Sequence, residues 1–276
     1  MTTSSVRVVS WNVNGVRARW PRLTELLASE QPDVVCLQET RCPDHRFPRE
    51  RLRELGYYSQ HSAGKRRGGV AILVREDHKV THRNIRLDHH RDIAEGRWLE
   101  VTIDGLTIAS VYVPAGPTRE EFDDAGKLAF LEAMAHQAHE EHTHPLLIAG
   151  DFNVAPTDQD VYEPTWFEGS YHTGEAERAD LREVLHYGEL IDVYRELHPD
   201  DRGYTCWDQR EGHYARDYGL RIDLVLASGN LASHVTRCDV NHSYRQGYRP
   251  SNHAPLEIEL DSIEACAHCL DEAIAA

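Results

Sequence analysis

Two side chains that could do phosphate chemistry stand two residues apart at the end of a short apolar run. The run spans 146–149, Gly150 follows it, and Asp151 and Asn153 come next. Because side chains on an extended chain repeat with a period of two, this carboxylate and this carboxamide point the same way. Gly150 would let the backbone turn or approach a ligand closely. The pair indicates metal binding, phosphate binding or proton transfer, and an Asx turn that only ends a strand is the alternative.

Polar side chains of this kind recur wherever an apolar run ends. A single acid at such a place is usually solvated or caps the next element, but six strand ends of this character predict one shared site. Carboxylate and amide oxygens suit a hard cation, a histidine can handle a proton or a phosphate, and an aspartate can orient that histidine. The side chains concerned are Asn12, Glu39, Tyr112, Asp151 with Asn153, Asp223, and Asn252 with His253.

The elements that must position these residues follow from apolar periodicity and turn signals. A hairpin is expected around Asp104 and Gly105, and the polar, aromatic segment 194–220 reads as a loop. Strands separated partly by helices and partly by hairpins predict an α/β fold of two mixed β-sheets with helices packed outside, in a single domain over 1–276 that ends in a C-terminal tail from 261. The expected strands are 6–10, 33–38, 70–74, 97–103, 106–113, 146–149, 222–227 and 255–260, and the expected helices are 21–30, 48–55, 120–139 and 177–187.

Composition narrows the class of protein. The formal charge of −16 over 276 residues argues against coating nucleic acid through net charge, although a cleft on an acidic body can still be positive. No apolar run reaches the length of a membrane span and no signal pattern opens the chain, so we expect a cytoplasmic protein without membrane contact. Six irregularly spaced cysteines read as reduced thiols, and the lone Cys266–Cys269 pair lacks the further ligands of a zinc site.

Seven motifs follow one another in order along the chain: SWNVNGVRARW at 10–20, LQET at 37–40, GGVAIL at 68–73, VYVPAG at 111–116, GDFNVAPTDQD at 150–160, LRIDLVLAS at 220–228 and SNHAPLEIEL at 251–260. Together they resemble exonuclease III, the abasic-site endonuclease branch of the endonuclease/exonuclease/phosphatase superfamily. The resemblance implies a four-layered α/β sandwich and a Mg²⁺-dependent phosphodiesterase, with Mn²⁺ as an alternative metal. It also implies duplex DNA as the substrate, nicked 5′ to abasic sites or trimmed at 3′ ends in base-excision repair.

The resemblance also implies how the catalytic residues divide the work. Asp151 is the candidate base or water-positioning group, and Asn153 orients the nucleophile or the phosphate. Tyr112 and His253 contact the scissile phosphate, and Asp223 is hydrogen-bonded to His253. Whether Asp151 or His253 takes the proton of the water stays open.

The metal site implied by the resemblance departs from the usual pattern. Asn12, Glu39 and Asn252 would form it, but Asn252 stands where the family's Ser-Asp-His motif has an aspartate. An amide oxygen can bind Mg²⁺ without contributing charge, so we expect weaker metal affinity and a shifted metal preference. Ala115 replaces a polar amide and Cys206 a bulkier aromatic side chain, which leaves the balance of DNA activities open.

Basic and aromatic stretches favour DNA over a small phosphate ester. A basic turn precedes the strand at 70, and the loop at 204–210 resembles the family's abasic-pocket loop, although a solvated turn and a core tryptophan are the alternatives. Tyr244, Arg245, Tyr248 and Arg249 interleave aromatic and basic side chains as a strand-tracking surface would. The side chains expected to contact DNA are Lys65, Arg66, Arg67, Arg97, Trp207, Arg210, Tyr248 and Arg249.

Two other functions compete with a DNA-repair phosphodiesterase. The chain could belong to another branch of the superfamily and hydrolyse a phospholipid or a small phosphate ester. It could also be a paralogue that binds DNA and has lost the chemistry, a hypothesis motivated by Asn252 and Ala115. We expect a monomer that associates with the nucleoid through DNA.

Overall fold

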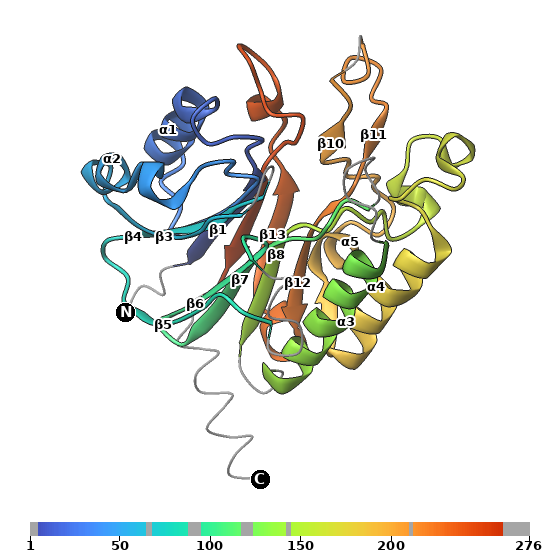
Figure 1. The fold of residues 1–276 in the computed structure, drawn as a ribbon, viewed down its shortest axis with the longest axis horizontal. Coiled ribbons are helices and arrows are strands. Elements are labelled where there is room, and N and C mark those ends of the chain that lie inside the picture. The colour runs from blue at the N-terminus through green and yellow to red at the C-terminus, as the bar shows by residue number, and fades with distance from the viewer. Residues whose placement is uncertain are drawn as a thin grey trace.

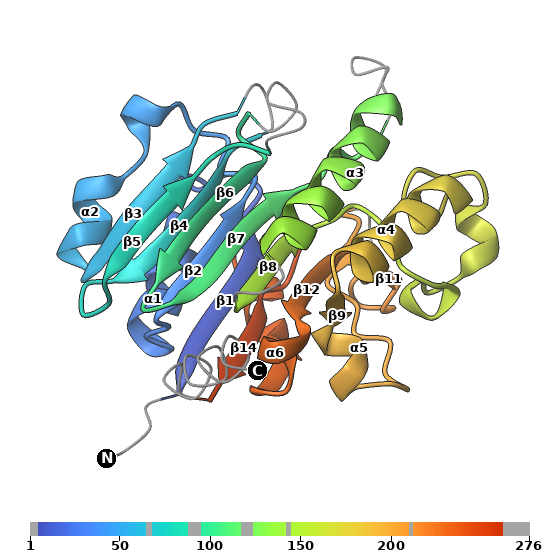
Figure 2. The ribbon, with the colours of Figure 1, turned by 90° about the horizontal axis from the view of Figure 1, so that it is seen from below.

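The computed structural model describes residues 5–64, 68–87, 95–116, 124–141, 145–209 and 212–261. Two six-stranded sheets dominate this part of the chain and pack face to face (Figure 1, Figure 2). In the first sheet the last strand of the chain lies beside the first one, and β1 and β2 are parallel while the other neighbours are antiparallel. The strand order is β13 (Val235–Val240), β14 (Leu256–Leu260), β1 (Val6–Asn12), β2 (Val34–Gln38), β4 (Val70–Arg75) and β3 (Tyr57–Ser62).

The second sheet is also mixed. Its parallel pair is β7 with β8, and the remaining neighbours are antiparallel. A separate two-stranded arm, β10 (Cys206–Trp207) with β11 (Gly219–Leu220), lies within the segment expected to be loop. The order of the second sheet is β5 (Val80–Asn84), β6 (Trp98–Ile103), β7 (Leu106–Tyr112), β8 (Leu146–Asp151), β12 (Asp223–Ser228) and β9 (Leu190–Asp192).

Helices cover the outer face of each sheet. Leucines of α1 and α2 share a buried cluster with the first sheet, whereas α3 and α4 share one with the second, and a third cluster joins the facing sides of the two sheets. This arrangement confirms the predicted four-layered α/β sandwich. The helices are α1 (Trp20–Ser29), α2 (Arg49–Glu54), α3 (Asp124–Glu141), α4 (Glu175–Tyr187), α5 (Val193–Leu197) and α6 (Gly229–Ala232), and 3₁₀ turns span Asp44–Arg46, Asp158–Asp160, Pro164–Phe167 and His242–Arg245.

Strong apolar runs and turn residues were sufficient to locate the central strands. β2, β7, β8 and β12 are buried along their whole length, which is why they read as uninterrupted apolar runs. The expected hairpin is present, because Asp104 and Gly105 have φ of 50° and 90°, as a two-residue turn between paired strands requires. The sequence prediction omitted β3, β5, β9 and β13, whose exposed or mixed patterns carry no comparable signal.

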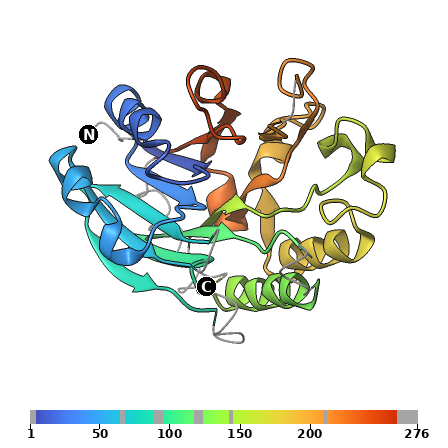
Figure 3. The same cartoon turned by 45° about the horizontal axis from the view of Figure 1, so that its top comes forward.

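The chain's loops gather at one end of the sandwich. Figure 3 shows the blue loop before α1, the red loop before β14, the orange β10–β11 arm and the yellow loop after β8 arranged around the ends of the central strands. In the described part of the chain, no helix is long and apolar enough to cross a membrane. The four cysteines that the structure describes are free thiols, as expected, and the tail from 262, with Cys266 and Cys269, lies outside the described residues.

Candidate active site

Three polar side chains meet on neighbouring strands of the second sheet. Asp151 at the end of β8 lies in register with Tyr112 of β7 on one side and with Asp223 of β12 on the other. Neighbours in register point to the same face, here the face packed on the first sheet. Gly150 makes no turn: a β-carbon there would lie 2.0 Å from the carbonyl oxygen of Val111, so glycine is needed for the close approach of β7.

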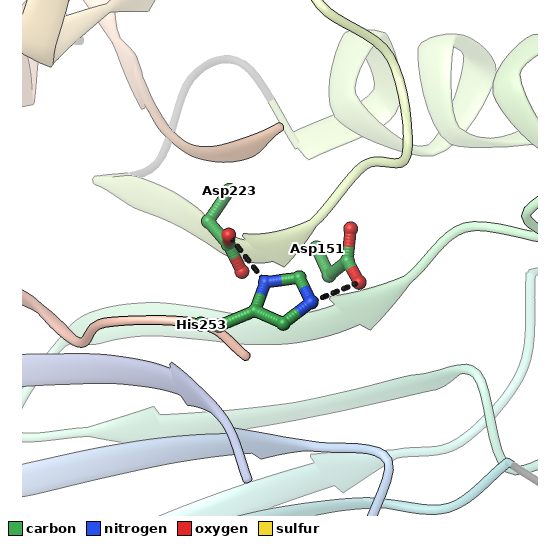
Figure 4. Close-up of side chains that lie close together, drawn as sticks. All are labelled: Asp151, Asp223 and His253. Atoms are coloured by element: carbon green, nitrogen blue, oxygen red, sulfur yellow. Dashed lines mark hydrogen bonds and ion pairs between the residues drawn. The ribbon is translucent and has the colours of Figure 1, made fainter. Parts of the chain in front are cut away.

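His253 lies against two of these carboxylates (Figure 4). Its Nδ1 is 2.7 Å from Oδ2 of Asp223 and its Nε2 is 3.9 Å from Oδ2 of Asp151, and all three side chains are almost fully buried. Contacts to β1 fix the loop that carries the histidine, because Nε1 of Trp11 donates to the His253 carbonyl at 3.1 Å and Oγ of Ser251 donates to the carbonyl of residue 12 at 2.7 Å. The ring is therefore held with one nitrogen on Asp223 and the other facing the site.

The buried charges shift one another's titration. Burial raises the pKa of Asp151 to about 7, opposed by His253 and reinforced by Asp223 and Glu39. Burial alone would lower the pKa of His253, but Asp223 and Cys206 outweigh it and the pKa of the imidazole lies well above its usual value. Near neutral pH the site therefore combines a cationic histidine with an aspartate that exchanges its proton easily.

The side-chain amide of Asn12 connects the carboxylate of Glu39, beside the first sheet, with that of Asp151 in the second sheet. Nδ2 of Asn12 donates to Oε1 of Glu39 at 3.1 Å and to Oδ2 of Asp151 at 2.8 Å. Because both oxygens bond to one nitrogen, they lie at most about 6 Å apart, which is a span that one hydrated divalent cation can bridge. Asn12 presents its N–H group here, so acting as a ligand would require its amide to rotate. Oε2 of Glu39 accepts from Nε of Arg41 at 2.8 Å and also from Nη2 of Arg41.

Asn252 does not contact Glu39 directly but is connected to it through a second amide. The backbone N–H of Asn14 donates to Oδ1 of Asn12 at 2.9 Å, and its side chain donates to Oδ1 of Asn252 at 2.5 Å. Nδ2 of Asn252 faces Sγ of Cys206 at 3.6 Å. The sequence prediction omitted Asn14, although it lies two residues beyond Asn12, as Asn153 does beyond Asp151.

Asn153 is held in a strained conformation by residues that sequence reasoning missed. Its φ is 53°, in the left-handed region, and its side-chain amide donates to the carbonyl of Val113 at 2.9 Å. Its own carbonyl accepts from Nζ of Lys127 at 2.9 Å and from Nδ1 of His172 at 2.8 Å. Lys127 is buried and also pairs with Glu177 at 2.9 Å. Nothing in the local sequence around Lys127 announces this long-range contact.

Tyr112 and Arg97 form the wall beside Glu39. Burial, together with the charges of Glu39 and Asp151, holds the pKa of the Tyr112 hydroxyl well above the usual value. The phenol therefore stays protonated and can donate to an anion. The guanidinium of Arg97 lies 5.0 Å from the centre of the Tyr112 ring, which keeps this expected DNA-contacting residue at the edge of the site.

The expected DNA-contacting residues fall into three groups. Tyr248, with 82% of its surface exposed, and Arg249 are free to meet a ligand, but Tyr244 and Arg245 are buried and so do not belong to that surface. Trp207 is only 1% exposed and its Nε1 donates to Asp217, which favours the alternative of a core tryptophan. Lys65, Arg66, Arg67 and Arg210 lie outside the described residues.

The sequence profile of the endonuclease/exonuclease/phosphatase family matches residues 9–253. The chain belongs to this family. Exodeoxyribonuclease III of Haemophilus influenzae is 32% identical over 92% of this chain and 99% of that protein. A DNA-(apurinic or apyrimidinic site) endonuclease of Dictyostelium discoideum is 26% identical over 94% of this chain and 71% of that protein.

Solved structures of the endonuclease/exonuclease/phosphatase family superpose over nearly the whole chain. The 3′ phosphatase NExo from Neisseria, bound to a product DNA hairpin, is 31% identical with a TM-score of 0.88, and the match covers 93% of this chain and 99% of that one. An AP endonuclease from Archaeoglobus fulgidus is 30% identical with a TM-score of 0.86 over the same shares. The expected resemblance to exonuclease III is thereby confirmed.

Proposed function

We propose that this protein is a metal-dependent DNA phosphodiesterase that nicks duplex DNA 5′ to abasic sites or removes nucleotides and blocking groups from 3′ ends. The observation that carries the proposal is the convergence of Asp151, Asp223 and His253 with Asn12 and Glu39 at the seam between the sheets. The names of the relatives, exodeoxyribonuclease III and abasic-site endonuclease, support the choice of DNA.

Hydrolysis of a phosphodiester needs an aligned water, a neutralised phosphate and a stabilised leaving oxygen. His253, kept cationic by Asp223, would face one phosphate oxygen, and the protonated hydroxyl of Tyr112 would donate to another. A cationic imidazole cannot accept the water's proton, whereas Asp151, whose pKa is about 7, can. We therefore assign Asp151 as the general base and Asn153 as the group that orients the water or the phosphate.

The donor set of the site fits Mg²⁺ better than a softer metal. Glu39 offers a carboxylate oxygen beside Asn12, and Asn12 and Asn252 could add amide oxygens, which is the ligand chemistry that Mg²⁺ and Mn²⁺ prefer. A second set, Asp151, Asp223 and His253, brings its atoms within 4.8 Å of one another. We favour the set with Glu39, because Oδ2 of Asp223 already pairs with Nδ1 of His253 at 2.7 Å. When bound, the cation would neutralise the phosphate and stabilise the leaving oxygen.

One experiment tests the reaction and the base together. Purified protein is incubated with a duplex that contains one abasic site, with and without Mg²⁺, alongside Asp151→Asn and the control Asp158→Asn, whose carboxylate is exposed and pairs with Arg178. We expect Mg²⁺-dependent nicking 5′ to the lesion, unchanged in Asp158→Asn and reduced at least 100-fold in Asp151→Asn, on the order expected for loss of a general base.

Other outcomes would select another function. Nicking that survives in Asp151→Asn would refute the assignment of Asp151 as the general base. Binding of the duplex without nicking in Mg²⁺ or Mn²⁺ would favour a binding-only paralogue, and turnover of phosphoinositides or simple diesters with abasic DNA untouched would favour another branch of the superfamily. The monomeric state also stays a prediction, and size-exclusion chromatography with light scattering tests it.

A further inference from the structure

Three arginines lie on three loops that meet beside Glu39. Arg19 precedes α1, Arg41 follows β2, and Arg249 lies in the loop before β14. Arg41 donates twice to Glu39, and Nη2 of Arg19 reaches the carbonyl of Pro250 at 3.3 Å, which joins the first loop to the third. Burial lowers the pKa of Arg19, and the charges of Arg41 and Arg249 lower it further. Backbone hydrogen bonds from Gly15 to Glu39 at 2.7 Å and from Val16 to Thr40 at 3.0 Å join the first loop to the second, so the three loops adjoin one another.

Positive charge in this cluster is only partly compensated. The negative charge of Glu39 raises the pKa of Arg19, whereas the positive charges of Arg41 and Arg249 lower it. Nε of Arg19 is buried and, among the described residues, has no hydrogen-bond partner. Arg249 is exposed and has a φ of 48°, so its backbone is held in an unfavourable region. A buried donor without a partner and repelling cations both destabilise the free protein, and an anion bound between them would relieve both.

We propose that Arg19, Arg41 and Arg249 bind a backbone phosphate of DNA beside the scissile one, and that Arg41 exchanges between this phosphate and Glu39. The ligand is a phosphodiester because planar guanidinium forks match phosphate oxygens in pairs, and because the cluster lies beside the proposed phosphodiesterase site. The inference rests on the proposed function for the identity of the anion. The exchange follows from Glu39, because Arg41 already neutralises this carboxylate through Oε2 and the cation would be held by the same carboxylate.

This exchange predicts effects of opposite sign for one substitution. Without DNA, Arg41 competes with the cation for Glu39, so Arg41→Ala should tighten Mn²⁺ binding by about tenfold, or ~1.4 kcal/mol. With DNA, the same substitution removes a phosphate contact and should lower the slope of log K against log salt by about one. Arg19→Ala and Arg249→Ala should lower that slope similarly without tightening Mn²⁺ binding. Arg41→Lys keeps the charge but not the paired donors, and should fall between Arg41→Ala and the wild type.

Two binding measurements test the proposal without catalysis. Fluorescence anisotropy with an abasic duplex in EDTA, between 50 and 200 mM salt, gives the slope. Electron paramagnetic resonance of free Mn²⁺ gives cation affinity without DNA. The matched control is Arg182→Ala on α4, whose side chain is 58% exposed and paired with Glu175, and it should change neither quantity. Thermal melting of each variant verifies folding, and the exposed Arg249 provides a variant that does not disturb packing.

The results separate this proposal from the function on which it rests. Wild-type slopes in all three alanine variants would overturn the phosphate site, and weaker Mn²⁺ binding in Arg41→Ala would overturn the competition. A wild-type protein that fails to bind the duplex at all would instead defeat the proposed function.

Discussion

Replacing Asp223 by asparagine should show whether the charge of His253 matters to the reaction. The two side chains are 2.7 Å apart and nearly inaccessible, so little water screens them. Two unit charges about 4 Å apart interact by ~4 kcal/mol at an effective dielectric constant of 20. Asparagine removes most of this attraction but fills the same space. Its amide can also turn its N–H group toward the ring and so favour the wrong tautomer.

The expected loss follows from that interaction. If the cationic form of His253 stabilises the transition state, its loss at neutral pH should lower the rate of nicking by about 10²- to 10⁴-fold, or ~3 to 5 kcal/mol. Burial would lower the pKa of His253, but the charge of Asp223 raises it above its usual value. The wild-type rate should therefore rise as Asp151 loses its proton near pH 7 and fall only at the higher pH where His253 loses its proton. In Asp223→Asn the rate should begin to decline at a lower pH than in the wild type, because His253 then loses its proton more easily.

Single-turnover nicking of an abasic duplex between pH 5.5 and 9, at saturating Mg²⁺, measures both effects. The matched control is Asp239→Asn, because Asp239 also faces a histidine, His198, at 3.2 Å, but its side chain is 41% exposed. That variant should keep the wild-type rate and profile. A loss below tenfold in Asp223→Asn, with an unchanged pH profile, would refute the reasoning that the buried carboxylate sustains the charge of His253.

Three further substitutions test other parts of the site. Asn252→Asp adds a carboxylate and should lower the Mg²⁺ concentration for half-maximal nicking by about tenfold; an unchanged titration with both Mg²⁺ and Mn²⁺ would contradict this. Lys127→Met leaves Glu177 buried without its cation and should cost about 3–5 kcal/mol in urea unfolding, partly recovered by Glu177→Gln; an additive double variant would argue against the pair. His172 has a pKa lowered to about 4 by burial, so the unfolded chain binds its proton first and stability is lost as pH falls from about 6.5 toward 4, by up to ~3 kcal/mol. His172→Gln should flatten that loss in unfolding curves at pH 7 and 4.5, and an equally steep loss would rule His172 out as its source.

The sequence was sufficient for the fold's centre and for the types of side chain at its strand ends. β8 and β12 could be predicted because strands buried on both faces are apolar throughout. The meeting of Asp151 with Asp223 could be anticipated only through the family resemblance, since strand periodicity does not say which strands are neighbours. Edge strands such as β13, VTRCDV, were missed because half of each edge strand meets water.

The contacts that hold the site together were the least predictable. Lys127 reads as an ordinary polar position on a helix, and only the packing of α3 against the loop after β8 turns it into a buried donor to Asn153. Arg41 lies two residues beyond Glu39, too close in sequence to suggest an ion pair, and their pairing depends on left-handed backbone at both residues, each with φ of 47°. Such conformations carry a cost that local sequence does not reveal.

The pairing of β1 with β14 has a consequence for the protein's synthesis. Glu39 emerges from the ribosome early, but the site also needs Asp223 of β12 and His253 of the loop before β14, and β14 itself must insert between β13 and β1. A nascent chain therefore carries an open first strand and no assembled site until β14 has been translated. A truncated product cannot cut the genome that encodes it, and its unpaired β1 edge makes it a substrate for chaperones and proteases.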